Sequence, residues 1–332
     1  MNMPRRLPVT LLTGFLGSGK TSLLHKALAD PRMTRTAVII NEVGEVGLDH
    51  LLLGRLDEDA MLLKSGCLCC SLKNDFTDTL ISLYQRRASG QFPPFERVVV
   101  ETTGLADPVP LLRLLLSQEP VNSWFSVRSV ITTVDTLIPL SPDDARPERF
   151  RQIALADHLV LTKTDLASAA QVSAVAQASR QINPRAQYIE DGGEDAVMSA
   201  LLDDERYPVV NTVFRRWPTP ALAPVESSHG GVNTCSLQLD QPLPWGELVR
   251  FFQLLARTYG KRLLRLKGLL DVEGAARPVV VHGVEHYLFP ETYLDAWPDE
   301  DRRSRLVFIG ENLDREYIEE MFNLTVMGKT SA

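Results

Sequence analysis

The stretch GFLGSGKT, residues 14–21, limits the possible folds of this chain more than any other feature of the sequence. It matches the phosphate-binding pattern G-x-x-x-x-G-K-[ST] at every fixed position, follows the apolar run PVTLLTG and opens a helical pattern. In such a loop, glycines let backbone N–H groups point at phosphate oxygens, and the helix dipole adds positive potential. The sequence therefore predicts a nucleotide-binding α/β domain.

The loop residues expected to bind nucleotide are Gly14, Gly17, Ser18, Gly19, Lys20, Thr21 and Ser22. Lys20 supplies a point charge to the β- and γ-phosphates, and Thr21 offers its hydroxyl to Mg²⁺. The apolar run RVVVE ends in Glu101, which is expected to bind the water shell of the same metal. Gly104 is expected to bring a backbone N–H to the γ-phosphate and to act as the pivot of a switch. The alternative for Glu101 is a solvated carboxylate at the end of a strand.

Short apolar runs alternate with helical patterns through the first two-thirds of the chain. The runs lie at 8–14, 36–42, 97–101, 129–135 and 158–163. Most of them are β-branched and nearly continuous, as in strands that are buried on both faces of a parallel sheet. This order predicts an α/β fold with a doubly wound, mostly parallel sheet that binds ligands at the carboxyl ends of its strands.

A change in composition predicts a second, smaller domain. Residues 215–232 are rich in Pro, Ser and Gly, which is typical of a linker. We therefore expect a nucleotide-binding domain over 1–214 and an α+β domain over 233–332. In the latter, strand patterns flank the helical stretch WGELVRFFQLLARTYG, which Gly260 closes, and the helical stretch REYIEEMF follows the last strand.

The segment LVLTKTD ends a later strand with Thr162, Lys163 and Asp165. An aspartate can accept two hydrogen bonds from the N1–H and N2–H edge of guanine, which adenine does not offer, and a lysine stem can lie along the base plane. Guanine-binding proteins usually carry Asn-Lys-x-Asp, and here Thr162 replaces the asparagine. Asp165 would also make a good N-cap for the helical pattern that follows, and both roles can coexist. We expect GTP or GDP rather than an adenine nucleotide.

Three of the four cysteines, Cys67, Cys69 and Cys70, crowd into KSGCLCCSLK. Reduced, clustered thiols predict a soft-metal site with at most three thiolates and one position open to a carboxylate, water or a partner. Zn²⁺ fits these ligands, and Co²⁺, Ni²⁺ and Fe²⁺ stay open. Glu42 and Glu45, in NEVGEVGLDH, are candidates to complete the metal shell or to orient the attacking water. The alternatives are solvated loop charges for the glutamates and a redox pair or buried thiols for the cysteines.

Charge and composition restrict the partners and the compartment. The formal net charge of −7 argues against a nucleic acid or an anionic membrane as partner. The basic cluster KRLLRLKG, residues 261–268, alternates with leucines and is predicted to be the solvated face of a strand. The N-terminus lacks a signal-peptide pattern and no transmembrane stretch follows, so we expect a cytoplasmic protein with reduced thiols. A Cys69–Cys70 disulfide would also be strained.

The segments TLLTGFLGSGKT, NEVGEVG, SGCLCCSL, VVVETTGLADP and LTKTD occur in this order. In this order and spacing, residues 7–190 resemble the CobW-like family of P-loop GTPases, most nearly its YjiA-type members, which are relatives of the nickel-insertion GTPases for urease and hydrogenase. Residues 233–325 resemble the C-terminal domain of that family more loosely. The resemblance implies GTP hydrolysis coupled to delivery of a transition metal, often zinc or cobalt, to a client metalloprotein. One departure is that SSHGGVN carries His229 alone where many members have a histidine-rich tract.

The leading hypothesis joins the two sites, because the thiol segment lies between the expected switches at 42–49 and at 101–104. A γ-phosphate with Mg²⁺ would order both loops and shape the thiolate pocket, and hydrolysis would loosen the metal. The rival interpretations are a kinase or ATPase with a structural zinc, a non-enzymatic zinc-regulated adaptor, and a redox switch. We expect the C-terminal domain to contact the client. The sequence leaves open the client, a homodimer and the identity of any arginine finger.

Overall fold

The computed structural model describes residues 6–41, 61–65, 74–141, 144, 146–190, 193–202, 231–289 and 291–328. The chain divides into two compact units. The first comprises residues 1–139, 156–176 and 186–209, and the second comprises 140–155, 177–185 and 210–332. Helix α5 (Pro147–Leu155) and the end of helix α6 (Ala169–Ile182) therefore group with the C-terminal part of the chain.

The first unit is built on a parallel sheet with the strand order β3-β2-β4-β1-β5-β6-β7. Its described strands are β1 (Leu7–Gly14), β2 (Thr36–Asn41), β3 (Met61–Ser65), β4 (Arg97–Glu101), β5 (Phe125–Asp135), β6 (His158–Thr162) and β7 (Gln187–Glu190). The central strands consist mostly of apolar and β-branched residues and are buried on both faces, as the continuous runs predicted. The doubly wound fold is confirmed.

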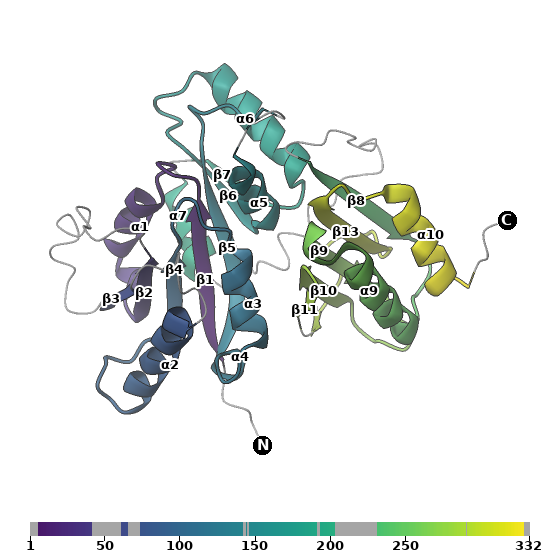
Figure 1. The fold of residues 1–332 in the computed structure, drawn as a ribbon, viewed down its shortest axis with the longest axis horizontal. Helices are drawn as coiled ribbons and strands as arrows, with labels where there is room; N and C mark the ends of the chain where they lie inside the picture. Colours follow the sequence, from purple (N-terminus) through teal and green to yellow (C-terminus); the bar gives the residue numbers. More distant parts are fainter. Residues whose placement is uncertain are drawn as a thin grey trace. The chain divides into compact units, whose positions relative to one another are not determined.

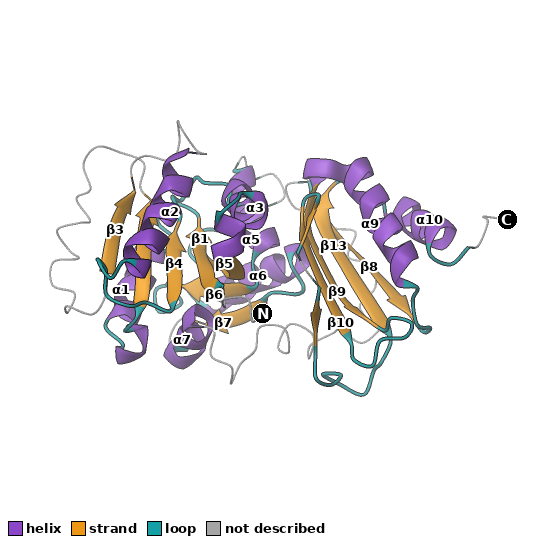
Figure 2. Ribbon diagram, turned by 90° about the horizontal axis from the view of Figure 1, so that it is seen from below, coloured by secondary structure: helices purple, strands orange, loops and turns teal. Residues whose placement is uncertain are grey.

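Helices cover both faces of this sheet (Figures 1 and 2). One face packs against α1 (Lys20–Leu28), the short helix η1 (Pro31–Met33) and α7 (Glu194–Leu202) in a shared apolar core. On the other face lie α2 (Asn74–Ala88), α3 (Val109–Ser117) and α4 (Val121–Trp124). Tyr84 and Trp124 stack with ring centroids 4.3 Å apart and fix α2 against α4. No helix within the described ranges is long and apolar enough to cross a membrane.

The start of α6 corrects one prediction. Asp165 does not cap this helix, which begins at Ala169. Ser168 does so instead, because its Oγ accepts from the Gln171 backbone N–H at 3.3 Å while its own backbone N–H donates to Gln171 Oε1 at 2.9 Å. This reciprocal capping box satisfies two backbone donors and leaves the Asp165 side chain out of the helix start.

The second unit contains an antiparallel sheet with the order β11-β10-β9-β13-β8, in which β12 also pairs with β10. Its described strands are β8 (Val232–Leu239), β9 (Leu263–Leu270), β10 (Val279–Val284), β11 (Tyr287–Leu288), β12 (Thr292–Tyr293) and β13 (Ser304–Glu311). Helices α9 (Trp245–Tyr259) and α10 (Arg315–Thr325) pack on one face over an apolar core that includes Phe251, Phe308 and Phe322. Gly260, at φ 54°, ends α9 as expected.

The basic cluster in β9 was predicted wrongly. Arg265 and Lys267 are only 3% and 1% exposed, whereas Lys261 and Arg262 lie in the exposed turn η3 (Gly260–Arg262) that precedes the strand. Helix α5 packs against β9 within the same unit, so the second face of the sheet is covered as well. Alternation with leucines predicts a two-faced strand, but it does not say whether the polar face meets water.

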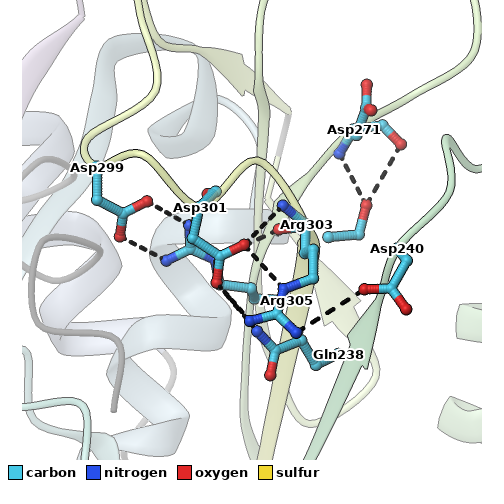
Figure 3. Close-up of polar contacts among 8 residues, drawn as sticks. Gln238, Asp240, Asp271, Asp299, Asp301, Arg303 and Arg305 are labelled. Carbon is cyan, nitrogen blue, oxygen red and sulfur yellow. Dashed lines mark hydrogen bonds and ion pairs between the residues drawn. The ribbon is translucent and has the colours of Figure 1, made fainter. Parts of the chain in front are cut away.

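A buried arginine, Arg305, lies near the start of β13 (Figure 3). Arg305 is 0% exposed and donates two hydrogen bonds to the Asp299 carboxylate, at 2.7 and 2.5 Å. It also donates to the backbone carbonyl of Asp301, whose carboxylate in turn accepts from Arg303 at 2.9 Å. The side-chain hydrogen bond from Arg303 lowers the pKa of Asp301 to about 2.

Candidate nucleotide site

The phosphate loop follows β1 and leads directly into α1. Gly14, Gly17 and Gly19 have φ angles of 142°, 69° and 87°, which only glycine adopts readily. A Cβ on Gly14 would also lie 2.2 Å from Thr133 Oγ1, so close packing against β5 excludes any side chain there. Gly19 is the N-cap of α1 and has no side chain to cover the first backbone N–H groups of the helix. The helix therefore presents these donors to an anion.

Lys20 lies folded over its own loop. Its Nζ donates to the backbone carbonyls of Gly14 at 2.8 Å and Phe15 at 3.1 Å, and the residue is 8% exposed. Burial lowers the pKa of Lys20, and the nearby Glu101 carboxylate opposes part of that shift. A phosphate group would supply the missing counter-charge, so the loop is prepared for a polyanionic ligand.

Thr21 and Glu101 meet although they lie 80 residues apart in the chain. The Thr21 Oγ1 donates to Glu101 Oε1 at 2.6 Å, and Glu101 is only 4% exposed at the end of β4. A hydroxyl and a carboxylate beside a phosphate loop form a set of hard oxygen donors, which is the set that Mg²⁺ prefers. The residues present therefore fit a magnesium ion. The alternative of a solvated carboxylate at position 101 is wrong.

Gly104 packs against the backbone of the phosphate loop. A Cβ on it would lie 2.6 Å from the backbone N of Leu16 and 2.7 Å from its Cα. The chain before it is fixed to β1, because the Thr102 backbone N–H donates to Leu12 O at 2.9 Å. The segment after Glu101 is thus bonded to β1 at one end and touches the phosphate loop at the other, and the switch role of Gly104 stays a prediction.

Thr162 connects the segment after β6 to the phosphate loop. Its Oγ1 donates to the Ser18 backbone carbonyl at 2.8 Å, and its own carbonyl accepts from the Thr136 hydroxyl at 2.8 Å. The Ser18 hydroxyl is 2.6 Å from Thr133 Oγ1. Thr162, which stands where guanine-binding proteins usually carry asparagine, therefore connects the segment that was predicted to bind the base to the phosphate loop.

Lys163 is held by a carboxylate that sequence reasoning missed. Its backbone has a φ of 57°, and its Nζ donates to Asp135 Oδ2 at 2.5 Å. Asp135 is 5% exposed at the end of β5 and also accepts from the Leu137 backbone N–H at 2.9 Å. The available signal was the acid that closes the run VITTVD, at the same sheet edge as Glu101 and Thr162.

A cavity of about 500 Å³ lies beside these residues and is also lined by Gly19. Its lining includes Thr162, Lys163 and Asp165 from the β6 side, and Lys26, Asp30 and Met198 from α1, the adjoining turn and α7. Asp165 is exposed at its rim. The cavity has the size of a small-molecule site, and its lining mixes apolar residues with polar and charged ones, so it offers both a surface for a planar ring and hydrogen-bonding groups.

The predicted soft-metal ligands lie outside the described residues. This applies to Cys67, Cys69 and Cys70 and to Glu42 and Glu45. No cluster of three or more His, Cys, Asp or Glu residues with metal-binding geometry occurs in the part of the chain that is described. The remaining cysteine, Cys235, is buried in the second unit, and burial raises the pKa of its thiol to about 11.

Comparisons with known proteins agree along the whole chain. Residues 8–190 match the family model CobW/HypB/UreG, nucleotide-binding domain, and residues 232–325 match the cobalamin synthesis protein cobW C-terminal domain. The chain is 32% identical over 320 residues to the zinc chaperone YjiA of Escherichia coli, covering 95% of this chain and 98% of that protein. It is 34% identical over 242 residues to the zinc-regulated GTPase metalloprotein activator 1 of Schizosaccharomyces pombe, covering 70% of this chain and 56% of that protein. The crystal structure of the Zn(II)-bound YjiA GTPase from E. coli matches with a TM-score of 0.71 and 27% identity, covering 97% of this chain and 99% of that one.

Proposed function

Because this chain belongs to the CobW/HypB/UreG family, we propose that it is a GTPase that couples GTP hydrolysis to the binding of zinc and its delivery to a client protein. The observation that carries the proposal is the contact between Thr21 and Glu101 next to the buried Lys20. A phosphate loop, a basic group and a hard-oxygen pair in one place are the parts of a phosphoryl-transfer site.

Each described residue has one role in this proposal. Lys20 exchanges its hydrogen bonds to the loop carbonyls for hydrogen bonds to the β- and γ-phosphates. Thr21 and Glu101 hold Mg²⁺ directly or through its water shell. Mg²⁺, when bound there, neutralises charge on the phosphates. The Lys163 stem covers the base, and Asp165 accepts from the guanine edge. Catalysis on such a site consists of positioning and charge neutralisation.

The zinc cargo is assigned to Cys67, Cys69 and Cys70, with Glu42 or Glu45 as the fourth ligand. The names of the relatives support zinc over Co²⁺, Ni²⁺ or Fe²⁺. The chain order supports coupling, because these residues lie between the phosphate loop and Glu101–Gly104. The CobW C-terminal domain over 233–332 is proposed as the surface that receives the client, and a cytoplasmic location follows from the reduced state that thiolate ligands need.

The test is isothermal titration of Zn²⁺ into protein preloaded with Mg²⁺ and a non-hydrolysable GTP analogue, beside the GDP form. We expect the two Zn²⁺ dissociation constants to differ by roughly 5- to 150-fold, and the analogue affinity to change by the same factor. Cys69→Ser should abolish tight binding in both forms. Cys235→Ser is the matched control, because this thiol is buried in the second unit and protonated at neutral pH.

Two results would contradict the proposal. Equal Zn²⁺ affinity in the two nucleotide forms would remove the coupling and leave a structural zinc. Displacement of the GTP analogue by ATP as effectively as by GTP would favour a kinase or ATPase instead.

A further inference from the structure

Thr103 carries a buried hydroxyl that makes no hydrogen bond within the described residues. The residue is 9% exposed, and its Oγ1 is shielded from solvent without a hydrogen-bond partner in the part of the chain that the structure describes. Leaving a hydroxyl buried and unbonded costs free energy, and valine would fill the same volume without that cost. A polar group in such a position suggests a ligand that is absent from the protein alone.

The neighbours of Thr103 define where that ligand binds. Glu101, two residues earlier, contacts Thr21 of the phosphate loop, and Gly104, the next residue, packs on Leu16 of the same loop. In an extended chain, side chains two residues apart leave on the same side and adjacent ones on opposite sides. Thr102 fits this pattern, since its hydroxyl donates to Thr13 on β1 at 2.8 Å. Strand β4 ends at Glu101, and continuing its alternation through Thr102 assigns Thr103 to the side of Glu101, where the phosphate and magnesium site is proposed.

We propose that Thr103 is a catalytic residue that holds the attacking water of GTP hydrolysis, with its hydroxyl accepting a hydrogen bond from that water. In the reaction the water oxygen bonds to the γ-phosphorus, and the bond from this phosphorus to the β,γ-bridging oxygen breaks with its electron pair leaving on GDP. The water proton is released to a phosphate oxygen and then to solvent, which gives GDP, inorganic phosphate and a proton. A threonine hydroxyl is no base, so Thr103 orients the water and accepts no proton.

The inference rests on the proposed GTPase function. The position of Thr103 in the chain favours a role in catalysis over a purely structural one. Thr103 is two residues from Glu101, the proposed magnesium ligand, and adjacent to the glycine that contacts the phosphate loop. Movement of this segment toward the γ-phosphate would carry the hydroxyl with it. Hydrolysis would then depend on the same segment that senses the triphosphate.

The experiment compares Thr103→Val, Thr103→Ser and wild type by two measurements. The first is the dissociation constant for a GTP analogue and for GDP with aluminium fluoride, a mimic of the transition state, in the presence of Mg²⁺. The second is single-turnover GTP hydrolysis. In Thr103→Val we expect analogue affinity within about 3-fold of wild type and both transition-state-mimic affinity and hydrolysis lower by about 10- to 100-fold. Thr103→Ser, which keeps the hydroxyl, should restore most of both.

Thr102→Val is the matched control, because it removes a neighbouring buried hydroxyl that already has a partner. It should lower the melting temperature, whereas Thr103→Val should leave the melting temperature equal or higher, since it removes an unbonded polar group. Transition-state-mimic affinity that is unchanged in Thr103→Val overturns the proposal. A raised Mg²⁺ requirement for analogue binding also overturns it, by assigning the hydroxyl to the metal shell. Failure of wild type to hydrolyse GTP at all would instead refute the GTPase function.

Discussion

The contact between Asp135 and Lys163 gives a prediction about nucleotide affinity. Replacing Asp135 with Asn keeps the shape of the side chain but removes its charge. The carboxylate is buried and 2.5 Å from Lys163 Nζ, while the lysine side chain is 33% exposed, so solvent screens part of the attraction. Loss of one partner of such a charged hydrogen bond costs about 1.5–3 kcal/mol before screening. Screening reduces the loss expected on nucleotide binding to about 1–2 kcal/mol.

At about 1.4 kcal/mol per factor of ten, this loss corresponds to GDP affinity that is roughly 5- to 30-fold weaker in Asp135→Asn. The reason is that Lys163, which lines the cavity proposed to bind the base, must then be ordered when the nucleotide binds rather than beforehand. Titration with a fluorescent GDP analogue measures the effect. Asp195→Asn makes the same change of charge at a carboxylate that is 90% exposed, so it should stay within about 2-fold of wild type. If Asp135→Asn binds GDP as wild type does while Lys163→Met binds it weakly, Asp135 does not position the lysine.

Two further predictions concern Gly104 and the acid stability of the second unit. Gly104→Ala should lower the free energy of unfolding by about 1–3 kcal/mol and reduce GTP hydrolysis at least about 10-fold, because the added methyl group would overlap the Leu16 backbone. Thermal denaturation and GTP turnover measure the two effects. Gly246→Ala in α9 is the control, because a Cβ there would meet open space. Asp301→Asn should lower the free energy of unfolding by about 1 kcal/mol at neutral pH, as the half-exposed pair with Arg303 is screened. Because the pKa of Asp301 falls to about 2 in the folded protein, the contribution of this carboxylate to the free energy of unfolding is complete above about pH 4 and is lost as the pH drops toward 2. Denaturant titrations of Asp301→Asn and wild type measure it. A difference between the two that stays constant from pH 6 to pH 2.5 would contradict this assignment.

The fold and the phosphate site follow from sequence because their signals are local. Glycines at fixed spacing determine the course of the loop between Gly14 and Thr21, and continuous β-branched runs determine the parallel strands. The meeting of Thr21 with Glu101 was also expected, since the carboxyl ends of neighbouring parallel strands share one edge of the sheet. These features need no knowledge of distant packing.

The features that sequence reasoning missed depend on which surfaces become covered. Lys267 alternates with leucines as a solvent-facing residue would, yet α5 comes from an earlier part of the chain to pack on its strand. Asp165 has the chemistry of an N-cap, but Ser168 and Gln171 make the better reciprocal pair three residues later. Asp135 was passed over because a single acid at a strand end gains meaning only when its partner, Lys163, is known.

The presence of Thr162 where guanine-binding proteins usually carry asparagine has a physical explanation in its hydrogen bonds. An asparagine amide can donate two hydrogen bonds, whereas a threonine hydroxyl donates one, and Thr162 uses it on Ser18 of the phosphate loop. The second brace comes from Thr136, whose hydroxyl and backbone N–H both donate to the Thr162 carbonyl. Thr162, at the end of β6, and Thr136, the residue after β5, thus fix the segment between the cavity and the phosphate loop. A base bound beside Lys163 is thereby connected through Ser18 to the loop that carries Lys20 and Thr21, so loosening either threonine should weaken binding of the whole nucleotide rather than of the base alone.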